Sequence, residues 1–245
     1  MNPIIIIPAR MAATRLPGKP LADIGGLPMI VRVLRQAQAA DAGPVVVAAG
    51  DPEIVAAVET AGGRAVLTDP DLPSGSDRIL AALASVDPDR AHDVVINLQG
   101  DMPFVAPDVL AACLRLLADQ PLCDIATVVA SEASPADGAN PDVVKAVLAM
   151  QPDGLTGRAL YFTRSTLYGD APVWCHVGIY GYRRAALERF TTAPPSPLEL
   201  REKLEQLRAM ELGLSIWAAV SQDAPISVDN PADLDKARAH ARSLP

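Results

Sequence analysis

The sequence predicts an α/β fold: a three-layer α/β/α sandwich built on a mostly parallel, mixed sheet. Short apolar runs alternate with stretches in which apolar residues recur at helical spacing, which is typical of parallel sheets covered by helices on both faces. At roughly 100–200 residues per domain, the 245 residues allow one large domain or two small ones. We expect a single domain over residues 1–245, with an excursion at about residues 130–175 that could serve an oligomer interface.

The first half of the chain indicates three successive strand–helix–strand steps. Apolar residues keep helical spacing from Met29 to Ala37 and from Ile79 to Leu83, and Pro52 stands where another helix could begin. A further helix from Val109 to Leu117 precedes an apolar strand at Ile125–Ala130. The first four expected strands are Ile4–Ile7, Val45–Ala49, Ala65–Leu67 and Val94–Leu98.

The second half is less regular. The proline-rich segment Ala193–Pro197 precedes a predicted helix from Leu198 to about Leu212. A last helix is expected from Pro231, because proline is favoured at the first helical position. The strands expected in this half are 143–148, 159–162, 175–182 and 214–220.

The composition excludes several classes of protein. With 21 Lys+Arg against 29 Asp+Glu the net charge is −8, whereas general nucleic-acid binders need a basic surface. No apolar stretch approaches the ~18 residues of a membrane helix, so we expect no membrane insertion. The run Ile4–Ile7 lacks a basic lead and is too short for a signal peptide, which favours a cytoplasmic protein. We interpret the unpaired Cys113, Cys123 and Cys175 as small core residues.

The segment from Pro8 to Pro20 follows the first strand and carries three cations, Arg10, Arg15 and Lys19, but no acid. Ligands of open α/β sheets bind beyond the carboxyl ends of the strands, and a local excess of positive charge suits a polyanion such as a nucleoside triphosphate. The alternative is a solvated basic loop. A Walker loop is excluded because Ala13 and Pro20 occupy two of its essential positions, and no Gly-x-Gly-x-x-Gly follows the strand.

Two aspartates are candidates for binding a metal ion. Asp101 follows a buried strand at the same sheet edge as Arg10, which suits a carboxylate that holds Mg²⁺ against triphosphate oxygens, and Gly100 would let a ligand approach closely. A turn-forming role is the alternative for Asp101. A capping role is the alternative for Asp229.

Against the capping role of Asp229, Pro231 fits the first position of the last helix. Asn230 is then the cap and Asp233 its capping-box partner. This assignment leaves Asp229 available to a metal ion.

Other polar residues have structural alternatives. Ser74 and Asp77 have the spacing of a helix start. Alternation places His176 and Tyr180 on one face of their strand, although a lone histidine is more often structural. The side chains of Glu205 and Gln206 could equally face solvent, with a packed stripe supplied by Leu200, Leu204 and Leu207.

Taken together, these segments resemble one family in order along essentially the whole chain. The opening, Ile7-Pro8-Ala9-Arg10 followed by Thr14-Arg15-Leu16-Pro17-Gly18-Lys19-Pro20-Leu21, is long and specific. It resembles that of the 3-deoxy-manno-octulosonate (Kdo) cytidylyltransferases, or CMP-Kdo synthetases. The remaining matching segments are Ser74–Arg78, Asn97–Asp101, Ala159–Arg164, His176–Tyr182, Pro195–Glu199, Leu204–Arg208 and Val228–Pro231.

The resemblance implies a nucleotide-diphospho-sugar transferase-like fold and transfer of a cytidylyl group from CTP to Kdo. It further implies Mg²⁺ as cofactor, a homodimer formed through the excursion, and a place in lipopolysaccharide synthesis. The catalytic residues would be Arg10, Arg15, Lys19 and Asp101, with the metal on Asp101 and Asp229. The nucleotide would meet Pro8, Ala9, Arg10, Lys19, Ser74, Arg78 and Gln99, and the sugar Arg164, His176, Tyr180, Glu205 and Gln206.

The chain departs from the family pattern in a few places. Met102 stands where the family usually has Glu, Ser74-Gly75-Ser76-Asp77-Arg78 replaces Ser-Gly-Thr-Glu-Arg, and the loop Leu167–Trp174 is shorter than in many relatives. Two other functions stay open from the sequence. One is transfer to another acidic sugar, such as 8-amino-Kdo or a sialic acid, and the other is a nucleotide-binding module without catalysis.

Overall fold

The computed structural model describes residues 1–12, 15–131, 138–168, 172–222 and 224–244. The chain divides into two compact units, which we call unit 1 (Met1–Leu110 with Pro225–Pro245) and unit 2 (Ala111–Ala224). The expectation of a single domain stays a prediction. Within the described residues, no helix combines the length and the apolar character needed to cross a membrane.

Unit 1 contains a parallel sheet whose central strand is almost wholly apolar. Strand β1 lies between β4 and β6, and its residues Ile4–Ile7 are at most 1% exposed. Both faces of this strand are therefore covered, as the uninterrupted apolar run predicts. The predicted strands are confirmed, in the spatial order β5 (Ala65–Leu67), β4 (Val45–Ala49), β1 (Pro3–Ala9) and β6 (Val94–Asn97).

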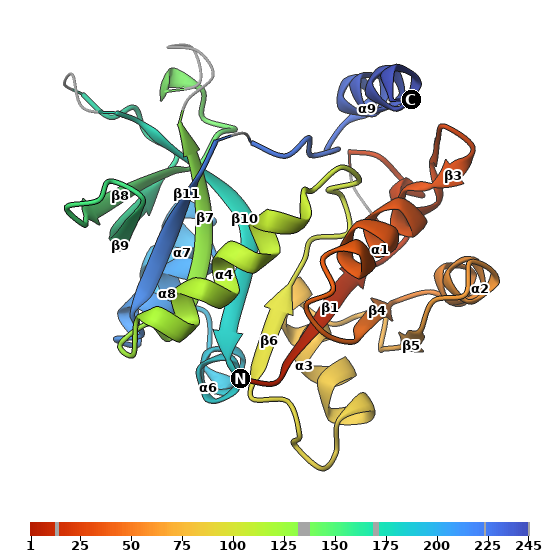
Figure 1. Ribbon diagram of the computed structural model, residues 1–245, viewed down its shortest axis with the longest axis horizontal. Helices are drawn as coiled ribbons and strands as arrows, with labels where there is room; N and C mark the ends of the chain where they lie inside the picture. Colours follow the sequence, from red (N-terminus) through yellow and green to blue (C-terminus); the bar gives the residue numbers. More distant parts are fainter. Residues whose placement is uncertain (13–14, 132–137, 169–171, 223, 245) are drawn as a thin grey trace. The chain divides into compact units, whose positions relative to one another are not determined.

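The order of the strands in unit 1 determines which face of the sheet each connecting helix covers. The chain moves outward from β1 to β4 to β5 and then returns across the sheet to β6 (Figure 1). Because such crossovers are right-handed, the returning helix α3 covers the face opposite α1 and α2, which makes three layers. The helices are α1 (Met29–Ala39), α2 (Pro52–Thr60), α3 (Gly75–Val86) and α9 (Pro231–Ser243).

The reversal of direction also prepares a binding site. The connections from β1 and into β6 run on opposite faces of the sheet, so a crevice opens beyond the carboxyl ends of these two neighbouring strands. The basic segment leaves β1 at this point and enters the 3₁₀ turn η1 (Lys19–Leu21). A small hairpin of β2 (Asp23–Ile24) and β3 (Leu27–Pro28) follows, which the sequence did not predict because two-residue strands carry no periodic signal.

Unit 2 holds a mixed sheet. Its spatial order is β10 (Trp174–Arg183), β7 (Ile125–Ser131), β11 (Ile216–Ser221), β9 (Thr156–Thr163) and β8 (Lys145–Met150). Strands β7 and β11 are parallel, whereas the other neighbours are antiparallel, and the first residues of β10 also pair with β8. The helices are α6 (Arg184–Thr192), α7 (Pro197–Glu202) and α8 (Gln206–Glu211), and α4 (Pro107–Asp119) spans the sequence boundary between the units.

The predicted helix from Leu198 to Leu212 is wrong as one element. Lys203 has a φ of 56°, a left-handed conformation that ends α7 before α8 begins. Helical periodicity therefore does not continue across Lys203. Of the predicted packed stripe, Leu204 and Leu207 are buried, but Leu200 is 67% exposed.

The cysteines agree largely with their interpretation as core residues. Cys113 and Cys123 are fully buried, and burial raises the pKa of each thiol to about 12. Cys175 is only partly buried, and within the described residues none of the three cysteines forms a disulfide. Because a thiol with such a raised pKa is protonated near neutral pH, neither Cys113 nor Cys123 is suited to act as a nucleophile.

Candidate active site

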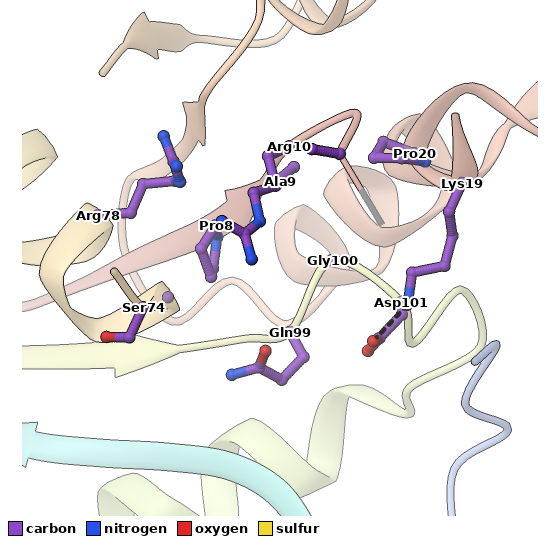
Figure 2. Close-up of a pocket in the computed structure, with 12 residues that line it drawn as sticks. Pro8, Ala9, Arg10, Lys19, Pro20, Ser74, Arg78, Gln99, Gly100 and Asp101 are labelled. Carbon is purple, nitrogen blue, oxygen red and sulfur yellow. Dashed lines mark hydrogen bonds and ion pairs between the residues drawn. The ribbon is translucent and has the colours of Figure 1, made fainter. Parts of the chain in front are cut away.

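A cavity of about 330 Å³ lies in unit 1 beyond the carboxyl ends of β1 and β6, within the roughly 300–1,000 Å³ typical of small-molecule sites. Figure 2 shows Lys19 and Asp101 at one end of it and Ser74 and Arg78 at the other. The structure thus brings together most of the predicted nucleotide-binding and catalytic residues. The cavity is lined by Pro8, Ala9, Arg10, Ala12, Lys19, Pro20, Ser74, Gly75, Arg78, Gln99, Gly100 and Asp101.

Gly100 brings the two strand ends together. A Cβ on this residue would lie 2.8 Å from the carbonyl oxygen of Pro8, closer than real Cβ contacts allow. Gly100 therefore allows a close approach to the protein's own backbone. Because Gly100 also lines the cavity, the close approach of a ligand to it stays a prediction. The residues on either side of it, Gln99 and Asp101, line the same cavity as Pro8 and Arg10.

The basic segment is folded back on itself. The N–H of Gly18 donates to the carbonyl of Met11 at 3.1 Å, and Gly18 adopts a φ of 71° that glycine tolerates without strain. The N–H of Met11 donates to Oδ2 of Asp51 at 2.7 Å. Asp51 was not predicted from the sequence, although its position directly after β4 at the same sheet edge is a signal that could have found it.

Lys19 lies against the two candidate metal ligands. Its Nζ is 2.9 Å from Oδ2 of Asp101 and 3.6 Å from Oδ1 of Asp229, and it also donates to the carbonyl of Val228 at 2.9 Å. The side chain of Lys19 is only 17% exposed, so the solvated-loop alternative is wrong for this residue. Arg10 and Arg15 are exposed, and Nη2 of Arg15 lies 3.3 Å from Oδ1 of Asp229.

The two carboxylates are held close together by the backbone. The N–H of Val228 donates to the carbonyl of Asp101 at 2.9 Å, which attaches the segment before α9 to the end of β6. Burial is the largest cause that raises the pKa of Asp101; Lys19 opposes this shift and the charge of Asp229 adds to it. Two carboxylates that share one ammonium form a set of hard oxygen donors already arranged around a cation.

The N-cap of α9 is Asn230, as predicted, and not Asp229. Oδ1 of Asn230 accepts from the N–H of Asp233 at 3.0 Å, so Asn230 is the cap. The reciprocal bond differs from the expected capping box, because the carboxylate of Asp233 accepts from the N–H of Asp229 at 3.3 Å, one residue earlier than expected. The carboxylate of Asp229 is not used in capping and points to the cations described above.

The carboxylates of Asp101 and Asp229 fit a divalent cation whose remaining ligands come from phosphate oxygens and water. Within the described residues, no group of three or more His, Cys, Asp or Glu side chains is placed to hold a metal ion. Asp101 and Asp229 supply two carboxylates, and Mg²⁺ is commonly bound by one or two carboxylates together with phosphate oxygens and water. Met102, which follows Asp101 in the sequence, is 6% exposed and offers no carboxylate of its own.

At the other end of the cavity, Ser74 caps α3. Its Oγ accepts from the N–H of Asp77 at 3.2 Å and donates to Oδ2 of Asp77 at 2.7 Å, as the Ser-x-x-acid spacing predicts. Capping does not exclude a role toward a nucleotide, since ligands also bind at helix N-termini. Nε2 of Gln99 donates to Oδ1 of Asn97 at 2.9 Å, which orients the amide beside the cavity.

Arg78 is buried and largely engaged within unit 1. Its guanidinium donates to Oγ1 of Thr68 at 2.5 Å and to the carbonyls of Asp69 and Pro70. Burial is the main cause that lowers the pKa of Arg78, and the nearby charge of Arg10 adds to the shift. Arg78 thus lines the cavity while its guanidinium holds the segment after β5. A direct contact of Arg78 with the nucleotide stays a prediction.

In unit 2, His176 and Tyr180 share one face of β10. Their ring centroids are 5.3 Å apart, although the pairing with β7 shifts in register between Val177 and Tyr180. Thr127 bridges this irregularity: its hydroxyl lies 2.8 Å from the carbonyl oxygen of Ile179 and 2.9 Å from Nε2 of His176. Because the hydroxyl hydrogen is given to the carbonyl, we assign the ring hydrogen to Nε2. Burial lowers the pKa of His176 to about 4, so the ring is neutral near pH 7.

The other predicted sugar-binding residues lie at the start of α8 and directly after β9. Glu205 is close enough to Tyr180 that its charge contributes to raising the pKa of that phenol. Gln206 is 7% exposed, so the solvent-facing alternative is wrong for it. Arg164, which follows β9, donates to the carbonyls of Pro141 and Asp142, and its own carbonyl accepts from Nζ of Lys145 at 2.7 Å.

Comparison with known proteins defines the family. The family model described as cytidylyltransferase matches residues 4–216. A 3-deoxy-manno-octulosonate cytidylyltransferase of Parvibaculum lavamentivorans is 55% identical over 97% of this chain and 92% of its own length. One from Rhodopseudomonas palustris is 57% identical over 96% of each chain.

Solved structures agree with this relationship. A CMP:2-keto-3-deoxy-manno-octonic acid synthetase complexed with CTP matches 100% of both chains with a TM-score of 0.91 and 38% identity. A 4-diphosphocytidyl-2C-methyl-D-erythritol synthase from Anaerococcus prevotii, at 12% identity and a TM-score of 0.66, shows the shared fold alone. The predicted nucleotidyltransferase-like α/β fold is thereby confirmed. With more than half of its residues identical to those of full-length relatives, the chain belongs to the 3-deoxy-manno-octulosonate cytidylyltransferase family.

Proposed function

We infer that this chain transfers a cytidylyl group from CTP to Kdo, giving CMP-Kdo and pyrophosphate. Within the family relationship, one observation of this chain carries the inference. The ammonium group of Lys19 lies between the carboxylates of Asp101 and Asp229, at the end of a cavity that Arg10 also lines. This arrangement suits a substrate that combines negative phosphate oxygens with a divalent metal ion.

The reaction itself needs positioning and charge neutralisation more than a covalent intermediate. The anomeric hydroxyl of Kdo attacks the α-phosphorus in line with the departing pyrophosphate. Arg10, Arg15 and Lys19 stabilise the charge that develops on the leaving group. An activated Ser or Cys nucleophile is not required for this route, and the raised pKa values of Cys113 and Cys123 agree with a core role for both.

We propose Mg²⁺ as the cofactor, held by Asp101 and Asp229. When bound, the ion would neutralise phosphate charge and orient the reacting oxygens. Lys19 now occupies the space between these carboxylates, so it is placed to turn from them to the triphosphate when substrate arrives. The side chain of Asp229 is 43% exposed against 22% for Asp101, which makes Asp229 the more accessible of the two ligands.

We propose that the sugar binds to Arg164, His176, Tyr180, Glu205 and Gln206. The tautomer assigned to His176 leaves the lone pair on Nδ1, which can accept from a sugar hydroxyl. A carboxylate such as Glu205 also accepts from hydroxyls, and the guanidinium of Arg164 suits the carboxylate of Kdo. The clustering of His176, Tyr180 and Glu205 in unit 2 supports this assignment.

Three further properties are proposals from the family relationship. The chain would act as a homodimer through the excursion at about residues 130–175, of which residues 132–137 and 169–171 lie outside the described part. It would work in the cytoplasm, and its product would enter lipopolysaccharide synthesis. Sedimentation of the purified protein tests the first of these directly.

The decisive experiment follows pyrophosphate release from CTP. The purified protein is incubated with Mg²⁺ and, in parallel, with Kdo, 8-amino-Kdo or a sialic acid. We expect release with Kdo, its loss on chelation of the metal, and a new CMP-sugar by mass spectrometry. Preference for another acidic sugar would change the acceptor, whereas CTP binding without release for any sugar would leave a non-catalytic nucleotide-binding module.

A further inference from the structure

Arg208 is the centre of a buried network of charged groups in unit 2. Its side chain is 7% exposed and that of Glu199 is 14% exposed. Nε of Arg208 donates to Oε2 of Glu199 at 2.8 Å, and Nη2 donates to Oε1 at 2.7 Å. Two parallel bonds of this kind fix the direction of both side chains more firmly than a single bond would.

The same guanidinium joins three helices. Nη1 donates to the carbonyls of Phe190 and Ala193 at 3.4 and 3.2 Å, and Cζ lies 4.7 Å from the centroid of the Phe190 ring. Glu199 is itself fixed by a capping box, since its Oε2 accepts from the N–H of Ser196 at 3.0 Å. Arg208 therefore links the end of α6, the first turn of α7 and its own helix α8.

The network includes Glu205, one of the proposed sugar ligands. Nη2 of Arg208 lies 3.3 Å from Oε1 of Glu205, whose side chain is 33% exposed and thus more open than Glu199. The left-handed Lys203 and the bond from the N–H of Leu204 to the carbonyl of Glu199, at 3.3 Å, set the turn that presents Glu205. One carboxylate oxygen of Glu205 therefore contacts the guanidinium of Arg208, which Glu199 holds in place.

We propose that Arg208, clamped by Glu199, is a positioning residue that orients the Glu205 carboxylate toward the sugar substrate. The proposal rests on the proposed function, in which Glu205 binds the sugar. It also gives a role to the segments Pro195–Glu199 and Leu204–Arg208, which resemble the family but whose Glu199 and Arg208 had no assigned role. An oriented carboxylate loses less conformational freedom on binding than a mobile one, so Arg208 acts on sugar affinity through Glu205.

A double-mutant cycle tests this. Arg208→Lys, which keeps the charge but not the paired fork, and Glu205→Gln are made singly and together. We expect Arg208→Lys to raise the KM for the sugar about 10-fold in the presence of Glu205 and by less than about twofold in the Glu205→Gln background. The KM for CTP should stay within about twofold in all variants.

The matched control is Arg184→Lys. Arg184 is also a buried arginine of unit 2, with Nε 3.2 Å from Oε1 of Glu188, but it lies on α6. This variant should leave the KM for the sugar unchanged even where it lowers the melting temperature. If Arg208→Lys does not fold by circular dichroism, Glu199→Gln releases the same clamp and replaces it in the cycle.

Two results would overturn the proposal. One is an equal rise in KM with and without Glu205, which would make Arg208 a structural clamp only. The other is a Glu205→Gln variant with wild-type KM for the sugar. Failure of the proposed function gives a different result, because the wild-type protein itself would then release no pyrophosphate with Kdo. In that case the role proposed for Arg208 would also be wrong.

Discussion

Nζ of Lys19 lies 2.9 Å from Oδ2 of Asp101 and 3.6 Å from Oδ1 of Asp229, so a single ammonium group serves two carboxylates from distant parts of the sequence. In the absence of substrate this lysine holds the carboxylates in position and reduces their mutual repulsion. In the proposed reaction the same charge serves the triphosphate. Lys19 is therefore expected to matter both to the geometry of the site and to turnover.

The first prediction concerns Lys19 and Arg10. Lys19→Ala and Arg10→Ala should each lower kcat by ~10²-fold or more, because each removes a charge that stabilises the leaving pyrophosphate. Steady-state rates of pyrophosphate release measure the effect. Arg35→Ala, which removes an exposed charge from α1 in the same unit, is the matched control and should retain normal turnover. Near-normal turnover in the Lys19 or Arg10 variant would contradict its assignment.

The second prediction concerns the two carboxylates. Asp101→Asn and Asp229→Asn should each raise the Mg²⁺ concentration needed for half-maximal rate by about 10-fold or more, because each removes a charged oxygen ligand. The effect should be larger for Asp101, whose side chain is the less exposed. Two measurements check this: the reaction rate as a function of Mg²⁺ concentration, and the binding of Mn²⁺ followed by electron paramagnetic resonance. Asp108→Asn on α4 is the control, and unchanged metal dependence at both sites would refute the assignment.

The third prediction concerns Gly100. Gly100→Ala should destabilise the protein by ~1–3 kcal/mol, because the added Cβ would be driven against the carbonyl of Pro8 and the strands must separate. Gly75 lies beside the same proline, but a Cβ there would be 3.5 Å from Cγ of Pro8, an ordinary contact. Gly75→Ala should therefore leave the free energy of unfolding nearly unchanged. Chemical denaturation of the two variants compares them, and equal stabilities would show that the close approach is not restrictive.

The fourth prediction concerns acid stability. Burial lowers the pKa of His176 to about 4, below the value of about 6.5 for an unfolded chain. Between these values the unfolded state binds the proton and the folded state does not, so stability falls as pH drops from about 6.5 toward 4. His176→Gln should show a smaller loss of melting temperature between about pH 7.5 and about pH 5 than the wild type. An identical loss in both proteins would show that His176 does not contribute.

The strands of unit 1 could be predicted because each is a short, continuous apolar run flanked by helix signals. Local chemistry also predicted the caps at Ser74 and Asn230, since a cap depends on residues three positions apart. The helix break at Lys203 could not be predicted, because lysine has no preference for the left-handed conformation that it adopts there. The exposed Leu200 follows from that break.

The sequence alone determined the alternation of strands and helices, the basic segment that follows β1 and the family to which the chain belongs. Only the tertiary structure decided that Lys19 sits between Asp101 and Asp229, because residues 82 and 210 positions away meet through strand order and a backbone bond from Val228 to Asp101. It likewise decided that Gly100 meets Pro8 and that Arg208 meets Glu199. Such contacts depend on packing between distant segments, which local periodicity does not encode.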